Sequence, residues 1–286
     1  MMDVLNVAHV TKHYKDFSLN DVSFTLPAGM ILGMIGENGA GKTTTIKAIL
    51  DLIAVDAGDI QIFGRDHHSD VKDIRQQIGV VMDGVNQNPF LFCKDVDAML
   101  KRIYKNWSSE KFFAYLDRFE LPKDKRIKEL SKGMNVKLNF AAALASAPRL
   151  LILDEATSGL DPVMRDEILS VLQEFVMDEQ NAVLMSTHIT SDLDKIADYI
   201  MFIHKGRILF VRSKEELDNS YGILHCKKSF FDALDPSDYD AYIKEPFSYK
   251  VLLNHKFETM EHFRDLDVEK ASIEDIMLFY VKGEHV

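Results

Sequence analysis

The stretch GENGAGKT, residues 36–43, places three glycines and one lysine directly before a segment with helical periodicity. It fits the pattern G-x-x-x-x-G-K-[ST], in which backbone amides turn inward and surround phosphate oxygens. The following helix directs its positive N-terminal end at the same anion. Lys42 is then expected to reach the β- and γ-phosphates, and Thr43 to hold Mg²⁺. The predicted contacts to the nucleotide are Gly36, Asn38, Gly39, Ala40, Gly41, Lys42, Thr43 and Thr44.

Acidic residues and a histidine follow two apolar runs. Asp154 ends the run LLILD, where its carboxylate could ligand Mg²⁺ through water, and Glu155 could polarise the attacking water. His188 follows AVLMST. A lone histidine is more often structural than catalytic, but a position at the end of a core strand favours contact with a γ-phosphate. Together with the glycine-rich loop, these residues predict a nucleoside triphosphatase.

The elements that must position these residues alternate between strands and helices. Residues 30–36, 150–155 and 182–188 are short apolar runs typical of strands buried on both faces of a parallel sheet. Pro162 suits the first position of a helix, with Asp161 as its N-cap. The alternation predicts an α/β fold whose polar strand ends meet at one edge.

Other segments predict smaller units. Residues 2–27 alternate in polarity, as antiparallel strands do, and residues 199–211 predict a hairpin that turns at 204–207. Residues 85–148 have only helical periods, which predicts a helical subdomain. The pattern after residue 213 is weak and mixed, and we expect a small accessory domain there.

Composition excludes some classes of function. The chain has 286 residues, 47% of them hydrophobic, and a net charge of −11, which argues against a nucleic-acid-binding surface. Its two cysteines, Cys93 and Cys226, lack metal-ligand spacing and suit a reducing compartment. No apolar run approaches the ~20 residues needed to span a bilayer. At a membrane, another chain would have to do the spanning.

The chain resembles the ATP-binding cassette family of transporter ATPases over roughly residues 3–215. GENGAGKT is similar to the Walker A motif, LLILDE to Walker B, SGLD (158–161, ending at Asp161) to the D-loop and His188 to the switch histidine. Tyr14 matches the aromatic that stacks on adenine. The resemblance implies a P-loop NTPase (RecA-like) core with an antiparallel β subdomain and a helical subdomain. It implies a nucleotide-binding domain over 1–215 and an accessory domain over 216–286.

Two family motifs depart from their usual form. The signature is LSKGM, residues 130–134, where LSGGQ is usual; Ser131 and Gly133 match, and Lys132 is expected to add positive charge near a partner's nucleotide. The sequence alone would also fit a capped helix start. Asp83 stands where the family has a glutamine that helps to hold Mg²⁺, and we expect it to serve as a metal ligand.

One loop and one signature per chain imply that two chains pair head to tail, either as a homodimer or with a related cassette. The resemblance implies an ATPase that uses ATP and Mg²⁺ at the cytoplasmic face of the cell membrane, docked on transmembrane permease subunits. Its layout is similar to Gram-positive peptide or toxin exporters of the phenol-soluble modulin type.

Two alternatives remain open at this point. A soluble mechanical ATPase could use the same head-to-tail pairing of cassettes to act on nucleic acid or ribosomes. Such relatives carry a coiled-coil insert or two cassettes in one chain, and the net charge of −11 is unfavourable for binding nucleic acid. A phosphate-loop kinase or GTPase would leave LSKGM unexplained, and no guanine-specific motif is evident.

Overall fold

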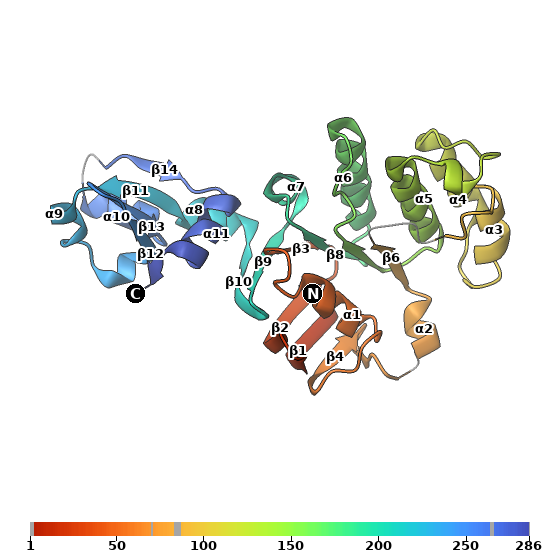
Figure 1. The fold of residues 1–286 in the computed structure, drawn as a ribbon, viewed down its shortest axis with the longest axis horizontal. Coiled ribbons are helices and arrows are strands. Elements are labelled where there is room, and N and C mark those ends of the chain that lie inside the picture. The colour runs from red at the N-terminus through yellow and green to blue at the C-terminus, as the bar shows by residue number, and fades with distance from the viewer. Residues whose placement is uncertain (1–2, 70, 83–86, 264–265, 286) are drawn as a thin grey trace. The chain divides into compact units, whose positions relative to one another are not determined.

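The computed structural model describes residues 3–69, 71–82, 87–263 and 266–285. The chain divides into two compact units (Figure 1). The first runs up to Ala197 and includes Ile203–Ile208; the second comprises Asp198–Phe202 and the chain from Leu209 onward. Within the described ranges, no helix combines the length and apolar character needed to cross a membrane.

A parallel sheet forms the core of the first unit. Its strands pair in the order β3 (Ile31–Ile35), β8 (Ala182–Thr187), β7 (Leu150–Asp154) and β6 (Ile78–Met82). Every residue of β3, β7 and β8 is buried, as the apolar runs predicted. The register places Asp154 beside Ser186 and therefore brings the polar strand ends to one edge.

Helices follow these strands directly. Three of them carry the segments of interest: α1 (Lys42–Ile49) after β3, α6 (Pro162–Val176) after β7 and α7 (Thr190–Ile196) after β8. The Asp161 carboxylate caps α6 by accepting a hydrogen bond from the Met164 amide at 3.0 Å. This confirms the predicted helix start and the α/β fold.

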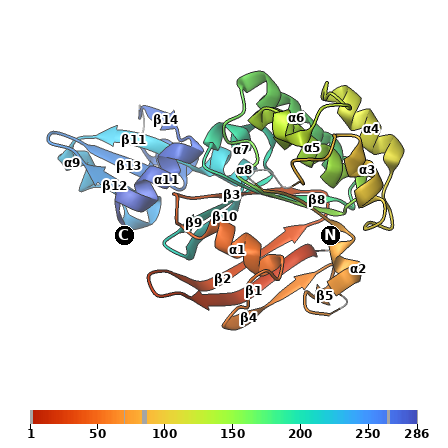
Figure 2. The ribbon, with the colours of Figure 1, turned by 45° about the vertical axis from the view of Figure 1, so that its right-hand side comes forward.

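A second, antiparallel sheet has the order β2 (Ser18–Pro27), β1 (Asp3–His13), β4 (Ala57–Ile62) and β5 (Arg65–Asp66). Buried and exposed residues alternate along β2, because only one face of this sheet is covered. Figure 2 shows α1 between this sheet and the parallel strands.

Helices dominate the described part of residues 71–148 outside β6. They are α2 (Val71–Arg75), α3 (Asp95–Leu100), α4 (Ser109–Arg118), a 3₁₀ turn at Ile127–Glu129 and α5 (Lys132–Ala145). Phe112 and Leu116 of α4 are fully buried, four residues apart on one helix face. Helix α4 packs against α5, whose first turn carries the signature.

The second unit has its own antiparallel sheet, in the order β14-β11-β13-β12-β15. Aromatic side chains fill its core; the rings of Phe231 and Tyr249 stack with centroids 4.4 Å apart. The hairpin of β9 (Tyr199–His204) and β10 (Arg207–Ser213) turns where the sequence predicted, and its turn belongs to the first unit. The remaining elements are α8 (Lys214–Ser220), β11 (Gly222–Cys226), α9 (Lys228–Phe231), a 3₁₀ turn (Pro236–Asp238), β12 (Tyr239–Lys244), β13 (Tyr249–Leu253), α10 (Lys256–His262), β14 (Val268–Lys270), α11 (Ile273–Lys282) and β15 (Glu284–His285).

Candidate functional site

The loop between β3 and α1 has a backbone that requires glycine. Gly39 and Gly41 have φ values of 81° and 119°, in the left-handed region that other residues rarely adopt. A Cβ on Gly41 would also lie 2.8 Å from Leu19 Cδ2. The turn between β9 and β10 supports the loop, because the Gly206 amide donates a hydrogen bond to the Ala40 carbonyl at 2.8 Å. The glycines thus allow a tight turn that ends at the first residue of α1.

Lys42, the first residue of α1, is almost fully buried. Its Nζ donates to the carbonyl oxygens of Gly36 at 2.7 Å and of Glu37 at 3.3 Å. The same Nζ lies 3.3 Å from Glu155 Oε1. The loop therefore wraps around a cation that also faces a carboxylate from the end of β7.

A cavity of about 430 Å³ opens above this loop. It is lined by residues of the loop, by the hydroxyl-bearing Thr43 and Thr44 of α1, and by Glu155. The residues around it are Asp16, Phe17, Glu37, Asn38, Gly39, Gly41, Lys42, Thr43, Thr44 and Glu155. Gly36 and Ala40 are buried beneath the loop rather than lining the cavity. The size, the helix N-terminus and the lysine suit an anionic, phosphate-bearing ligand.

Ser186 of β8 holds the neighbouring acid. Its Oγ donates a 2.6 Å hydrogen bond to Asp154 Oδ1, and both side chains are buried. Glu155, the next residue, has φ of 51°, and its amide hydrogen-bonds the Ser186 carbonyl at 3.1 Å. A left-handed glutamate is strained, and such strain is common at functional sites. The turn directs the two carboxylates to different partners.

Glu155 also contacts His188. His188 Nδ1 lies 2.6 Å from Glu155 Oε2, and the histidine side chain is 49% exposed. Because a carboxylate oxygen only accepts, Nδ1 carries the hydrogen of this bond. Glu155 thus bridges Lys42 and His188, and three residues that the sequence selected from separate segments meet at one edge of the sheet.

Below these residues, a buried contact joins the segments after β7 and β8. Thr157 Oγ1 donates to Asp192 Oδ2 at 2.8 Å, and Arg165 Nε lies 3.9 Å from Asp192 Oδ1. Burial raises the pKa of Asp192, against the opposing effect of the Thr157 hydrogen bond and the Arg165 charge. This contact fixes the spacing of the turns that carry Glu155 and His188.

Tyr14 lies at 45% exposure outside the set of residues that line the cavity. Its amide donates to the Phe17 carbonyl at 2.8 Å, and the two rings are 6.5 Å apart. Phe17 lines the cavity itself, and sequence reasoning missed it, as it missed Asp16 and Ser186. The available signal for Phe17 was a second aromatic three residues after Tyr14 in the same loop.

The signature residues form a separate cluster at the start of α5. Ser131 Oγ caps the helix by accepting from the Met134 amide at 3.2 Å. A Cβ on Gly133 would lie 2.6 Å from Met164 Sδ, so glycine permits close approach of α6. Lys132 Nζ lies 3.4 Å from the position of a Cβ on Gly159 in the D-loop. None of Ser131, Lys132, Gly133 and Asp161 lines the cavity above the loop. Asp83 lies outside the described residues.

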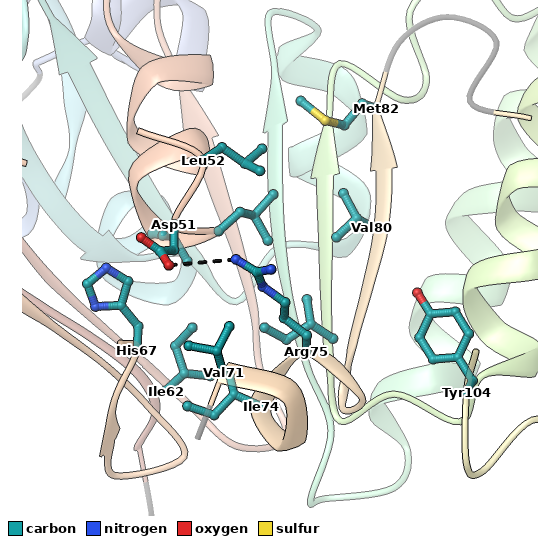
Figure 3. Close-up of a pocket in the computed structure, with 13 residues that line it drawn as sticks. Asp51, Leu52, Ile62, His67, Val71, Ile74, Arg75, Val80, Met82 and Tyr104 are labelled. Atoms are coloured by element: carbon teal, nitrogen blue, oxygen red, sulfur yellow. Dashed lines mark ion pairs between the residues drawn. The ribbon is translucent and has the colours of Figure 1, made fainter. Parts of the chain in front are cut away.

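A second, mainly apolar pocket of about 310 Å³ lies between α1, α2 and β6 (Figure 3). Its lining residues are Ile49, Leu50, Asp51, Leu52, Ile62, His67, Val71, Ile74, Arg75, Ile78, Val80, Met82 and Tyr104. Arg75 Nη2 lies 3.6 Å from Asp51 Oδ2 at one side of it. The pocket thus has an apolar floor with a charged pair at its edge, and Tyr104 reaches it from the helical insert.

Comparison with known proteins places this arrangement in a family. A family model described as ABC transporter matches residues 19–158. The bacitracin transport ATP-binding protein BcrA of Enterococcus faecalis is 30% identical over 273 residues, which cover 94% of this chain and 83% of the relative. The lantibiotic transport ATP-binding protein SrtF of Streptococcus pyogenes is 32% identical over 223 residues, covering 76% of this chain and 93% of the relative.

A solved structure described as the ATP binding subunit of an ABC transporter has the same fold. It matches with a TM-score of 0.69 and 26% sequence identity, and the match covers 75% of this chain and 91% of that one. The loop, the strand-end acids and these likenesses agree, and the chain therefore belongs to the ABC transporter family as one of its ATP-binding, ATP-hydrolysing subunits.

Proposed function

We propose that this chain hydrolyses ATP in the cavity above residues 36–44 and so drives export through separate membrane-spanning subunits. The observation that carries the proposal is the meeting of Lys42 and His188 on the Glu155 carboxylate, at 3.3 Å and 2.6 Å. The names of the relatives, which refer to bacitracin and lantibiotic transport, support export of peptides, toxins or drugs. No specific observation favours a soluble mechanical ATPase.

The proposed roles follow from the chemistry of each group. Amides of residues 36–44 and Lys42 Nζ bind the phosphates, and Phe17 with Tyr14 provides aromatic surface for the base. Glu155 orients the attacking water, and His188, which contacts Glu155, binds the γ-phosphate. For Glu155 to orient the water, its 3.3 Å contact with Lys42 Nζ must break. The Lys42 ammonium is then available to bind the phosphates.

Thr43 and Asp154 offer the hard oxygen donors that suit Mg²⁺, which neutralises phosphate charge when bound. The Thr43 residue lines the cavity, and the Ser186 hydroxyl holds the Asp154 carboxylate at 2.6 Å. The donor set therefore fits the metal. Asp83 is proposed as a further ligand on sequence grounds alone.

We propose residues 1–215 as the nucleotide-binding domain and 216–286 as an accessory domain. Ser131, Lys132, Gly133 and Asp161 are then expected to face the nucleotide of a second cassette, either an identical chain or a related one, across a two-fold axis. The separation of these residues from the cavity supports this composite site.

The apolar pocket around Leu52 and Met82 is proposed as the docking place for a cytoplasmic segment of a transmembrane permease subunit. Leu52 is 59% exposed although it is apolar, and Tyr104 contributes from the helical insert. Docking there would hold the chain at the cytoplasmic face of the membrane.

The variant Glu155→Gln tests this function. It keeps the shape of the side chain but removes the carboxylate that orients water, so turnover of ATP should fall at least ~100-fold. The variant should also form an ATP-bound dimer, visible by light scattering with Mg²⁺ present. Glu110→Gln, at an exposed position in the first turn of α4, is the control and should behave as the parent chain. A Glu155→Gln chain that turns over normally, or that stays monomeric in saturating ATP, would refute the proposal.

A further inference from the structure

Three potential metal ligands gather at one edge of the apolar pocket, away from the nucleotide cavity. They are Asp51, which follows α1, and the consecutive residues His67 and His68 after β5. One ligand atom of each lies within 4.8 Å of the ligand atoms of the other two. Over the part of the chain that the structure describes, this is the one such group found among histidine, cysteine and acidic side chains.

The spacing of two of these atoms suits a shared ion. His68 Nδ1 lies 3.3 Å from Asp51 Oδ1. Two atoms that each lie about 2.1 Å from a tetrahedrally coordinated ion are about 3.4 Å apart. The rings of His67 and His68 have centroids only 3.9 Å apart, so the second imidazole lies beside the first.

The environment of His67 leaves a lone pair for this site. The residue is only 6% exposed, and its Nδ1 lies 3.1 Å from the Ile60 carbonyl oxygen. Because that oxygen can only accept, Nδ1 carries the hydrogen and Nε2 keeps its lone pair. An imidazole held by a carbonyl through one nitrogen is the usual arrangement of a metal-binding histidine.

Arg75 would compete with a metal ion for the Asp51 carboxylate, because both are positively charged. Figure 3 shows the Asp51 carboxylate between the His67 ring and the Arg75 guanidinium. The two carboxylate oxygens divide their contacts, since Oδ2 lies 3.6 Å from Arg75 while Oδ1 faces His68. A cation on Oδ1 therefore does not require the arginine to be displaced, although the positive charge of Arg75 weakens the site.

We propose that Asp51, His67 and His68 bind a Zn²⁺ ion, with water at the fourth position. Two imidazoles and one carboxylate form a nitrogen-rich set that suits zinc rather than Mg²⁺ or Ca²⁺, which prefer oxygen ligands. The ion would tie the end of α1 to the turn after β5 at the rim of the pocket. The proposal stands independently of the nucleotide site, because no residue of the group lines the nucleotide cavity.

The test is zinc binding by the full chain, produced without a histidine tag, stripped with chelator and kept free of nucleotide. Competition against a chromogenic zinc chelator should give one tight site per chain. Co²⁺ as a spectroscopic substitute should give visible absorption bands typical of a four-coordinate nitrogen and oxygen site.

The variants His68→Ala and Asp51→Asn should each weaken zinc binding by at least about tenfold and abolish the Co²⁺ bands. His68 is exposed, so its replacement should not impair folding. The matched control is His9→Ala, because His9 is an exposed histidine paired with Asp21 at 2.7 Å without a third ligand. Absence of a stoichiometric site in the parent chain, or equal losses in His9→Ala and His68→Ala, would overturn the proposal.

Discussion

At the scale of single residues, the strand-end carboxylates receive their roles from neighbours that are far away in sequence. Asp154 and Glu155 are adjacent, yet Asp154 is held by Ser186 while Glu155 contacts Lys42 and His188. The sequence predicted the acids, the lysine and the histidine, because each stands at the end of an apolar run or in a spaced motif. Ser186 could not be singled out, since its role depends on the pairing register of β7 and β8.

Removing the Ser186 hydroxyl should affect the metal rather than the nucleotide. In Ser186→Ala, the buried Asp154 carboxylate loses its 2.6 Å donor and is free to rotate. The Mg²⁺ concentration needed for half-maximal ATP hydrolysis should rise about tenfold, with ATP binding nearly unchanged. Titration of turnover against Mg²⁺ measures this. Ser146→Ala is the control, because its buried hydroxyl bonds only the Ala143 carbonyl of its own helix; an equal shift in both variants would contradict the assigned role.

At the scale of elements, Asp56 joins β1 to the start of β4. Its carboxylate accepts from the His13 amide at 2.6 Å and from Lys12 Nζ at 2.9 Å. The His13 backbone hydrogen bond, then those of the Lys12 and His13 side chains, lower the pKa of Asp56 to about 2. Since the pKa is depressed, the stability that this carboxylate contributes is present above its ordinary value of 3.8 and is lost as pH falls toward 2.

Asp56→Asn should therefore lower the melting temperature of the first unit at pH 5, and this difference from the parent chain should be smaller at about pH 2.5, where the contribution of the carboxylate is being lost. Thermal unfolding of parent and variant at both pH values measures the difference. Asp59→Asn, an equal change of charge at an exposed position of β4, should leave the melting temperature unchanged. A difference that is as large at about pH 2.5 as at pH 5 would show that folding does not depress the pKa of the Asp56 carboxyl.

Asp240 has the corresponding place in the second unit. It accepts from Tyr221 at 2.9 Å, from Tyr280 at 2.7 Å and from Asn254 at 2.8 Å. Burial, with the Asp240 charge next, raises the pKa of Tyr221 to about 12 and also raises the pKa of Tyr280, so both hydroxyls remain donors at neutral pH. The Asp240 carboxylate of β12 thus connects α11 with the residue after β13 and with the residue before β11.

Asp240→Ala should loosen this unit, because each donor left without an acceptor costs about 1–3 kcal/mol. Hydrogen exchange of the full chain, read by mass, should show faster exchange in β12 and β13 and unchanged exchange in β3 and β7. Asp232→Ala, at an exposed position, serves as the control. Protection of β12 and β13 equal to that of the parent chain would refute this role of Asp240.

The contrast between the two units explains how far the sequence could predict the fold. Strands β3, β7 and β8 are buried on both faces, so each is a continuous apolar run that could be predicted as a strand from the sequence alone. In the second unit, pairing is less regular: β12 has an irregular register against β13, and β15 has two residues. Its core instead depends on aromatic contacts such as Phe231 on Tyr249, which no spacing rule predicts.

At the scale of the whole molecule, the chain has surfaces that other chains would have to complete. Ser131, Lys132 and Gly133 of the signature do not line the nucleotide cavity, and Leu52 of the apolar pocket is exposed. A second cassette and a membrane-spanning chain would complete these surfaces. The central claim is therefore that the chain works as the ATPase subunit of a transporter assembly.

Co-purification from detergent-solubilised native membranes tests this claim most directly. The tagged parent chain should retain a stoichiometric multi-helix membrane protein, identified by mass. Leu52→Glu should lose that partner because it places a charge in the apolar pocket proposed as the docking place, while it should still bind ATP. Glu110→Gln should retain the partner. Recovery of the parent chain only from the soluble fraction, with nucleic acid or ribosomes attached, would contradict the account.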